Sequence, residues 1–526
     1  MTLGVETELK SYEPHVTQEL IDRAHARRMN QIEDYFAILQ RQEMYRNFNL
    51  YAEFNKPLER KQLIWATRLT IMKYPILGHT IIPKDIPNHD LFYRSEEYYG
   101  GVHPDRDFIK VLDRLELSGL LINDQIEYRP LFQKIVEQYI EDEYEYTAKV
   151  IELVGSIKIP YHHKERPNWR LLCLPCKEDS LLSNKLIMIS NHCSLDGISC
   201  VNFFQDLAAN MSHDHSADVI FDETIFDYSR DFAQLSKLAN PMTAYIDCRP
   251  YNSELPRIIL SDLIKKYLNY TWDNEIVSII DHERVQTYHQ ILNFTPDQIS
   301  SIKDSIKSNV HPECTLTPFL QTCFVVALQK HGTFLKKRFR EFGFDIALIK
   351  NLRTLLPDNA DIRNEMRYSC SIGAQHYSYL ISSFKVNYKD EKKFWSLVKY
   401  YYDTIQNNPR GFLHSIGLLM VDNIGEYMNI DKVVLKDYLK KKRGGALISN
   451  LGYHPQKLEQ QYHVTDMVFS QTPGSLRFAI GMNAVTTNVK GLNIDLSIVR
   501  TAIPSRTEWG AFCDEFRKTV QNFTGI

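Results

Sequence analysis

One short segment of the chain combines residue types that can move a proton near neutral pH. Residues 190–197 read SNHCSLDG, which places His192 before Asp196 and Gly197 in an HxxxDG pattern. Histidine has an ordinary pKa of about 6.5, so its imidazole can accept a proton from a reacting group. We therefore predict that His192 is a general base. Judged by the spacing alone, a histidine and a carboxylate that have only a structural role are the more common case.

The elements around this segment are expected to be a strand and a helix. Residues 185–189 (KLIMI) form a short apolar run between polar residues, which predicts a buried strand. After the motif, apolar residues recur at helical spacing at Val201, Phe204 and Leu207. The motif's Asp-Gly pair stands at the entry of this helix. His192 should therefore lie at the carboxyl end of the strand, at the edge of a sheet.

Other catalytic and binding motifs are missing from the sequence. Its 21 glycines never fall two, four or five residues apart, which excludes the standard dinucleotide-binding, nucleophile-elbow and P-loop patterns. The nine cysteines include one close pair, Cys173 and Cys176, without a second pair at zinc spacing. No HExxH segment or EF-hand loop occurs. The sequence therefore predicts no metal site.

Composition and charge are those of an ordinary globular protein. With 526 residues, 44% of them hydrophobic and 12% aromatic, the chain can build large cores and would normally divide into two or more domains. The 62 basic and 65 acidic side chains nearly balance, so there is no general electrostatic footprint for nucleic acid. The N-terminus lacks an apolar signal region, and no run of about 18 apolar residues occurs. We expect a monomer that faces the cytosol, with reduced thiols.

Helical and strand patterns alternate in both halves of the chain, which predicts an α/β fold of two comparable domains. We place the N-terminal domain at residues 1–240, a crossover at 241–284 and the C-terminal domain at 285–526. In the first domain, strands are also expected at residues 80–82, 150–160 and 169–175. In the second domain, strands are expected at residues 289–294, 346–349, 369–380, 445–449, 477–482 and 493–499.

Six blocks along the chain carry a resemblance to a known family. In chain order they are HARRM at 25–29, PNWRLLCLP at 167–175, SNHCSLDG at 190–197, CTLTPFLQ at 314–321, RGGALISNLG at 443–452 and TTNVKGLNIDLS at 486–497. From about residue 13 to the C-terminus, the chain resembles the fungal alcohol O-acetyltransferases. These enzymes belong to the CoA-dependent acyltransferases with chloramphenicol acetyltransferase-like domains. Several blocks in one order are far more specific than HxxxD alone.

The resemblance implies two α/β domains that face one another, with a solvent tunnel between them and His192 at its middle. Acetyl-CoA, a co-substrate rather than a bound cofactor, and an alcohol would enter from opposite mouths. His192 would take the proton from the alcohol hydroxyl as the oxygen attacks the acetyl carbonyl. It would then protonate the departing CoA thiolate, and the product would be an acetate ester.

The resemblance also assigns roles to residues around His192. Asp196 is expected to anchor the loop through Arg353 and to be a structural carboxylate rather than a relay partner. Gly197 is expected to permit a close turn from strand to helix. From the residues alone, His25, His79, His163 and His376 are expected to be hydrogen-bonded or on the surface.

Two further pairs of residues could take part in the reaction. Ser449 and Asn450 are candidates for stabilising the oxyanion or binding substrate, although a strand end with a turn fits them equally well. Cys193 and Ser194 are tempting as acyl-enzyme nucleophiles beside His192. Neighbouring residues on an extended segment point to opposite faces, so neither is expected to hand its proton to that histidine. We therefore expect direct transfer between the two substrates.

Two amphipathic helices are expected near the ends of the chain. The helix over residues 17–41, which allows one interruption, carries Leu20, Ile32, Phe36 and Leu39 on its apolar side. The helix over residues 507–523 carries an aromatic stripe of Trp509, Phe512, Phe516 and Phe523. The sequence alone favours packing of this stripe onto the protein. The resemblance favours a membrane, because the fungal enzymes attach through such helices, so we expect peripheral attachment to the cytosolic face of the endoplasmic reticulum and to lipid droplets.

Three classes of function are open at this point. The leading hypothesis is an acetyl-CoA-dependent alcohol O-acetyltransferase. A second is an acyltransferase for another acceptor, such as an amine, a sphingoid base or a sterol, because HxxxDG does not specify the nucleophile. A third is a non-catalytic member that binds membranes. The intact motif argues against the third, and the blocks outside the motif favour the first over the second.

Overall fold

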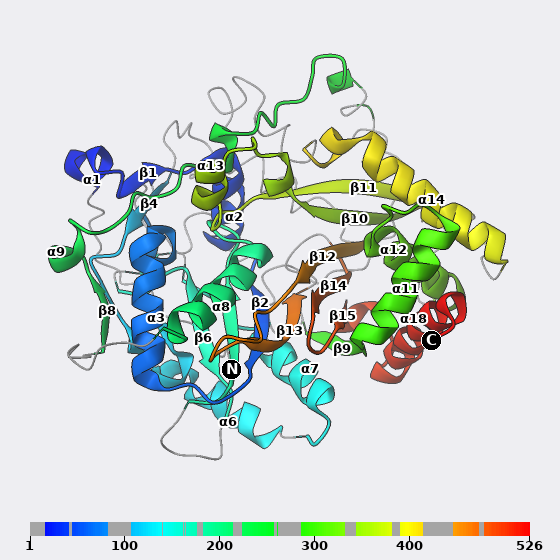
Figure 1. Ribbon diagram of the computed structural model, residues 1–526, viewed down its shortest axis with the longest axis horizontal. Coiled ribbons are helices and arrows are strands. Elements are labelled where there is room, and N and C mark those ends of the chain that lie inside the picture. Colours follow the sequence, from blue (N-terminus) through cyan, green and yellow to red (C-terminus); the bar gives the residue numbers. More distant parts are fainter. Residues whose placement is uncertain are drawn as a thin grey trace.

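The computed structural model describes residues 16–41, 45–82, 107–138, 140–160, 162–163, 165–175, 182–213, 223–256, 260, 286–331, 343–380, 390–413, 445–472 and 478–526. Within these residues, the strands form two larger sheets and two small ones. Figure 1 shows two lobes side by side, one with β2, β6, α3 and α8 and the other with β10, β15, α12 and α18. The predicted crossover lies largely in residues 257–259 and 261–285, outside the described part of the chain.

The first lobe is built on an antiparallel sheet with the strand order β13-β2-β7-β6. Its strands are β2 (Phe48–Phe54), β6 (Trp169–Cys173), β7 (Lys185–Ser190) and β13 (Val464–Gln471). β7 is the strand predicted from the KLIMI run, and the HxxxDG segment follows it directly. β13 comes from the C-terminal half of the chain. The boundary predicted at residue 285 therefore does not separate the two sheets.

Helices pack on both faces of this sheet. On one face, α8 (Gly197–Met211) packs on β2, and α3 (Arg60–Lys73) packs on α8. The other face carries a separate apolar cluster with α6 (Arg129–Glu137) and α7 (Glu143–Val154). Side chains alternate between the two faces of a strand, so Leu50 joins the first core and Tyr51 the second. Both cores hold β7 in a dry position.

The second lobe is built on a mixed sheet with the strand order β11-β10-β12-β14-β15-β9. Its strands are β9 (Thr287–Phe294), β10 (Gly343–Asn351), β11 (Ile372–Leu380), β12 (Ala446–His454), β14 (Ile480–Thr487) and β15 (Leu492–Val499). The β10–β12 and β12–β14 pairs are parallel and the others are antiparallel. Its helices are α11 (Pro296–Asn309), α12 (Leu316–His331), α14 (Glu391–Asn407) and α18 (Arg506–Thr524). The predicted α/β alternation is confirmed in both lobes.

Shorter elements fill the space around the first lobe. A small sheet of order β1-β4-β3 contains β1 (Ala26–Arg28), β3 (His79–Ile82) and β4 (Phe108–Val111). A second contains β5 (Arg114–Glu116) and β8 (Thr224–Asp227). Further short helices are α1 (Gln18–Asp22), α2 (Gln31–Arg41) and η1 (Pro75–Gly78). In the second lobe, η7 (Leu352–Leu355) and α13 (Ala360–Glu365) follow β10.

Two sequence predictions in the first lobe can be compared with the structure. The helix expected over 17–41, with one interruption allowed, is divided into α1 and α2, because Ala24 has a left-handed φ of 55° and β1 follows it to pair with β4. The strand expected over 150–160 is wrong, because residues 150–154 form the last part of α7 and the residues after them belong to no strand. Tertiary pairing and packing outweigh the local pattern in both places.

The aromatic stripe of α18 packs inside the second lobe. Trp509, Phe512 and Phe516 are 1%, 0% and 0% exposed, and Phe512 meets Phe324 of α12 edge-on at 5.6 Å between ring centroids. Phe523 stacks on Phe394 of α14 at 3.6 Å. The membrane contact predicted for this stripe is therefore corrected, because side chains buried against α12 and α14 cannot also face lipid.

The residues predicted for membrane contact near the N-terminus are in a similar position. Ile32, Phe36 and Leu39 of α2 belong to the core of the first lobe, and Leu20 of α1 is partly buried. None of the helices in the described ranges is long and apolar enough to cross a membrane.

A substitution in α18 tests whether its stripe is part of the core. Phe516→Ser should lower the free energy of unfolding by about 3–5 kcal/mol, because it removes a fully buried aromatic ring. Lys518→Ser, at an exposed position of the same helix, is the matched control and should change it by less than about 0.5 kcal/mol. Denaturant unfolding followed by circular dichroism measures both. Equal stability of the two variants would contradict the packing.

Candidate active site

His192 lies in the turn between β7 and α8, enclosed by aromatic rings. His192 is only 3% exposed. Phe48 of β2 stacks on the imidazole with 4.1 Å between ring centroids and 17° between planes. The ring centroids of Phe36 in α2 and of Tyr45 lie 4.9 and 5.5 Å from the centroid of the imidazole. These rings fix the plane of the imidazole and keep it away from bulk water.

The hydrogen bond of His192 defines its protonation state. Nδ1 lies 3.1 Å from the carbonyl oxygen of Leu195, and a carbonyl can only accept, so Nδ1 carries the hydrogen. Burial lowers the pKa of His192 to about 4, against smaller raising effects of the Leu195 carbonyl and Asp196. At neutral pH the imidazole is therefore uncharged, with Nε2 as its basic nitrogen. This is the form that a general base requires.

Asp196 joins the motif to the second lobe. Its Oδ2 accepts from Arg353 Nη1 at 2.7 Å and from the backbone N–H of Ser371 at 2.9 Å. Its Oδ1 accepts from the backbone N–H of Ser199 at 2.9 Å, which caps the N-terminus of α8. Arg353 stands in η7, directly after β10. The contact predicted between Asp196 and Arg353 is therefore confirmed.

The charge of Asp196 is settled by these partners. Burial raises the pKa of the carboxyl, but the Arg353 guanidinium and the amides of Ser371 and Ser199 outweigh it, so the pKa is lowered. Asp196 is ionised at neutral pH and is 1% exposed. Its hydrogen bonds reach Arg353, Ser199 and Ser371 rather than the imidazole of His192. The geometry fits an anchor better than a relay.

Gly197 is required by a close approach between elements. A Cβ at this position would lie 2.7 Å from Leu451 Cδ2 and 3.0 Å from Phe469 Cε2. Its backbone is not among those with positive φ in the described residues, so the close turn expected there is not what selects glycine. The start of α8 instead packs directly against β12 and β13. Any larger residue would push the HxxxDG segment away from the second lobe.

Ser449 and Asn450 lie in the middle of β12, just before Leu451, which faces Gly197. Asn450 donates to Thr317 Oγ1 at 3.1 Å and accepts from the backbone N–H of Gly452 at 2.9 Å. Gly452 has a φ of 93°, and the register with β14 shifts after Asn450. Asn450 is thus engaged where the register of β12 becomes irregular, whereas Ser449 precedes this irregularity and is 3% exposed. Ser449 is the stronger candidate of the two for a contact with substrate.

One contact at the motif had no signal in the sequence. Ser194 Oγ lies 2.8 Å from Nε2 of His79, the first residue of β3. The three rings around His192 were also missed as a group, because they come from α2, β2 and the segment between them. Periodicity assigns such residues to a core without saying what the core encloses.

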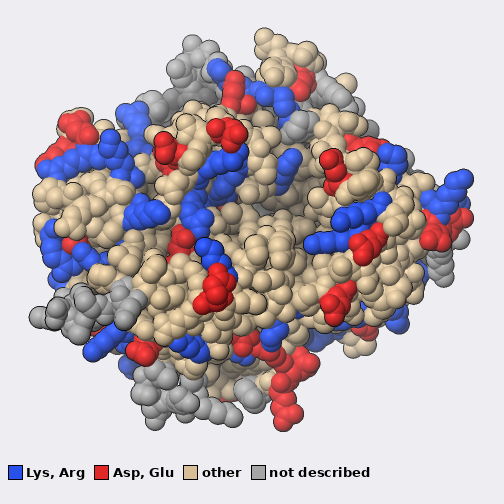
Figure 2. All heavy atoms as spheres, in the orientation of Figure 1, with Lys and Arg blue, Asp and Glu red and all other residues tan. Residues whose placement is uncertain are grey.

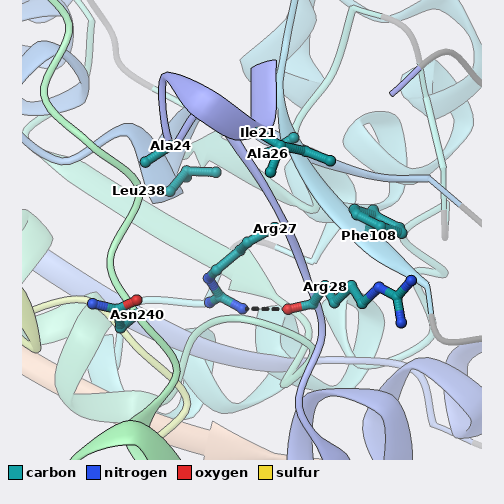
Figure 3. Close-up of a pocket in the computed structure, with 8 residues that line it drawn as sticks. All are labelled: Ile21, Ala24, Ala26, Arg27, Arg28, Phe108, Leu238 and Asn240. Carbon is teal, nitrogen blue, oxygen red and sulfur yellow. Dashed lines mark hydrogen bonds between the residues drawn. The ribbon is translucent and has the colours of Figure 1, made fainter. Parts of the chain in front are cut away.

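The HARRM block has a structural role at the far edge of the first lobe. A pocket of about 380 Å³ opens there, and Figure 3 shows Arg27 among its lining residues, donating to the carbonyl of Arg28. Arg27 also donates to the Ala239 carbonyl and pairs with Glu33 at 2.8 Å. The block therefore ties β1 to α2 and to the segment before η5 (Met242–Ala244). None of the residues that line this pocket belongs to the HxxxDG segment.

Metal-binding residues do not cluster in the part of the chain that the structure describes. No group of three or more His, Cys, Asp or Glu side chains there could hold a metal ion. The described cysteines, Cys193 and Cys200 near the motif among them, are buried thiols that form no disulfide with one another. Cys176, the partner of Cys173 in the close pair, lies outside the described residues. On the face seen in Figure 2, basic and acidic side chains are interspersed.

Comparison with known proteins fits this geometry. The family model described as alcohol acetyltransferase matches residues 28–520. The chain is 42% identical to alcohol O-acetyltransferase 2 of Saccharomyces cerevisiae over 533 aligned positions, which cover 99% of this chain and 100% of that protein. It is 36% identical to alcohol O-acetyltransferase 1 of the same yeast, over 95% of this chain and 96% of that protein. The chain belongs to the alcohol acetyltransferase family.

Solved structures show that this family member has a two-lobed, chloramphenicol acetyltransferase-like fold. A trichothecene 15-O-acetyltransferase from Fusarium sporotrichioides matches with a TM-score of 0.62 at 12% identity, over 95% of each chain. An epimerization domain of tyrocidine synthetase B matches with a TM-score of 0.54 at 13% identity, over 94% of this chain and 95% of that one. At these identities the likeness concerns the fold alone. The predicted fold class is confirmed.

Replacing the anchoring carboxylate should separate its effects from those of a catalytic relay. Asp196→Asn should lower the free energy of unfolding by about 3–5 kcal/mol, because it leaves the buried Arg353 guanidinium unpaired. The matched control is Asp403→Asn, which breaks a solvent-exposed ion pair with Lys399 on α14 and should cost no more than about 1 kcal/mol. Thermal and denaturant unfolding measure both variants.

Acetyl transfer should fall in the same Asp196→Asn variant, by about 10- to 100-fold, because the loop that carries His192 is released. A variant that unfolds like the unmodified protein but has a shifted pH–rate profile would contradict the anchoring role. That result would mean that Asp196 acts on the chemistry of His192.

Proposed function

We propose that this protein transfers the acetyl group of acetyl-CoA to alcohols, giving acetate esters, with His192 as the general base. Membership of the alcohol acetyltransferase family supports the substrates. The observation that carries the mechanism is the neutral imidazole of His192, whose Nδ1 hydrogen is held by the Leu195 carbonyl. Its Nε2 is the nitrogen that can accept the proton of an alcohol.

The reaction then runs in two steps that share one proton. As the alcohol oxygen attacks the thioester carbonyl, its proton passes to Nε2 of His192, and a C–O bond forms. The tetrahedral intermediate collapses, the C–S bond breaks, and the CoA thiolate takes the proton from the imidazolium. The dry surroundings of His192 disfavour the imidazolium, so they favour return of the proton to the leaving group. A positioned base of this kind contributes about 10²- to 10⁴-fold.

We propose direct transfer without an acetyl-enzyme, and the neighbours of His192 support it. The thiol of Cys193 lies 3.1 Å from Gln40 Oε1 and 3.0 Å from Asn191 Oδ1, and Cys193 is 0% exposed. The hydroxyl of Ser194 bonds to His79. Each candidate nucleophile therefore has a partner other than His192.

The route of the substrates is proposed from the position of the motif between the lobes. The Asp196–Arg353 pair and the contact of Gly197 with Leu451 both join the HxxxDG segment to the second lobe. Acetyl-CoA and the alcohol would meet at His192 from opposite sides, through a tunnel along this junction. Ser449, in the middle of β12, is the candidate that would donate to the acetyl oxygen as negative charge develops there.

The cellular location is a separate proposal that rests on the family resemblance. Peripheral attachment to the endoplasmic reticulum and lipid droplets stays a prediction, as does the monomeric state. Because the apolar stripes of α2 and α18 are buried, attachment would have to use another part of the chain. Separation of membranes from cytosol, with the protein detected in each fraction, tests it.

Loss of the base is the direct test of the proposed function. His192→Ala should lower kcat for acetyl transfer by at least about 10²-fold and leave the fold intact. His213→Ala, at an exposed histidine just after α8, is the matched control and should keep full activity. Thiol release from acetyl-CoA, measured with a panel of alcohols, sterols and amines, reports both rate and acceptor class. Turnover in His192→Ala at the rate of the unmodified protein would rule out the mechanism.

The direct route makes a second prediction. Intact-protein mass spectrometry after mixing with acetyl-CoA alone should show no added acetyl group, and Cys193→Ala should keep most of the activity. A stoichiometric acetyl adduct on Cys193 or Ser194 would mean that the reaction passes through an acetyl-enzyme.

A further inference from the structure

A buried hydrogen bond links the middle of the HxxxDG segment to the small sheet of the first lobe. Ser194 Oγ lies 2.8 Å from His79 Nε2. Ser194 is 1% exposed and His79 is 0% exposed, so the contact is dry. Ser194 is the second residue after His192 and directly precedes Leu195, whose carbonyl holds the Nδ1 hydrogen of His192. His79, which lies outside the motif, thus bonds to Ser194, the residue that precedes Leu195. The Leu195 carbonyl in turn keeps the hydrogen of His192 on Nδ1.

The direction of this hydrogen bond is fixed by a third group. Nδ1 of His79 bonds to the carbonyl oxygen of Ile76, which can only accept, so Nδ1 carries the hydrogen. Burial lowers the pKa of His79 to about 4, more than the Ile76 carbonyl raises it, so the ring is neutral. Its single hydrogen is used by Ile76, and Nε2 must accept. The Ser194 hydroxyl therefore donates to His79.

His79 is itself held by rigid neighbours. It begins β3 directly after η1, and both β3 and the Gly78 carbonyl pair with the β4 segment. The indole of Trp169, in β6 beside β7, donates to the Leu77 carbonyl at 2.7 Å. A Cβ on Gly78 would lie only 3.0 Å from Ile71 of α3. The acceptor for Ser194 is therefore fixed to the sheet and to the helix that position the motif.

We propose that His79 is a positioning residue for acetyl transfer: by accepting the hydroxyl of Ser194 it holds the Leu195 carbonyl against Nδ1 of His192. This inference rests on the proposed role of His192 as the base. With the bond in place, His192 keeps its hydrogen on Nδ1 and presents Nε2 to the alcohol. Without it, the segment keeps the contacts of Cys193 with Gln40 and Asn191 before Ser194 and the Asp196–Arg353 pair after Leu195, but Ser194 loses the hydrogen bond that holds the middle of the segment.

The pair also has the composition of a nucleophile with its base, oriented by a third group. Its burial argues against that role, because a thioester would have to reach a hydroxyl that is 1% exposed and whose partner is 0% exposed. Acetylation of Ser194 is therefore an outcome of the test below, and it would overturn the positioning role.

Four variants of the full-length protein test this inference. Ser194→Ala and His79→Leu should each lower kcat by about 10- to 100-fold while KM for acetyl-CoA and alcohol changes little, because the reacting groups lose alignment and not binding. The double variant should be no slower than the slower single variant, since both remove the same bond. His79→Gln, whose side-chain oxygen can accept near the position of Nε2, should recover a large part of kcat.

A neighbouring substitution separates this role from a general loss of structure. Thr80→Val changes the next residue of β3, which is also buried and bonds to His162 rather than to the motif. It should keep kcat within about twofold of the unmodified protein. Thermal unfolding of every variant identifies any loss of activity that only follows loss of fold. Ser194→Ala removes one oxygen atom and is the variant that keeps the test usable if His79→Leu does not fold.

Three results would overturn the inference. They are full kcat in Ser194→Ala, losses that multiply in the double variant, and an acetyl adduct on Ser194 after mixing with acetyl-CoA. Each can occur while His192→Ala remains inactive, so failure of this inference differs from failure of the proposed function. Activity retained by His192→Ala would instead contradict the proposed function, whatever the His79 variants show.

Discussion

The arrangement of the site depends on the ion pair between Asp196 and Arg353. The carboxylate caps α8 in the first lobe and pairs at 2.7 Å with a guanidinium carried by the second. Burying either charge costs desolvation energy that only its attraction to the other charge offsets. Separating the two therefore leaves an unpaired charge in a site without water, which is strongly unfavourable. The pair therefore sets the relative position of the lobes at the point where the motif meets both. Gly197 allows that close approach, since a Cβ there would overlap Leu451.

The close packing around the motif also determines the protonation state of His192. Rings from α2, β2 and the segment between them exclude water from His192, and desolvation disfavours the imidazolium. The charge of Asp196 raises the pKa of the histidine, but by less than burial lowers it. The oxygens of Asp196 are bonded to Arg353 and to backbone amides. The carboxylate thus stabilises the architecture while the histidine stays neutral. A protein can therefore keep a full negative charge next to its base without tying up the proton acceptor.

Local structure around the motif was predictable from the sequence, and its long-range contacts were not. The strand at 185–189 and the helix after the motif follow from periodicity and from the Asp-Gly entry. Arg353 lies 157 residues from Asp196, and only the family resemblance connected them. His79 lies 115 residues from Ser194, and a single histidine on a strand carries no pattern that names its partner. The stripe of α18 indicated an apolar face, but an amphipathic pattern does not say whether lipid or α12 covers it.

The proposed mechanism requires His192 to be neutral at working pH, with its hydrogen on Nδ1 and its basic nitrogen at Nε2. Nitrogen NMR of protein labelled only in histidine reports the hydrogen position and the titration of each imidazole, and the His192→Ala variant assigns the signal. We expect an Nδ1–H tautomer that does not titrate until the pH approaches about 4. A signal that titrates near the ordinary value of about 6.5, or that shows the hydrogen on Nε2, would contradict it.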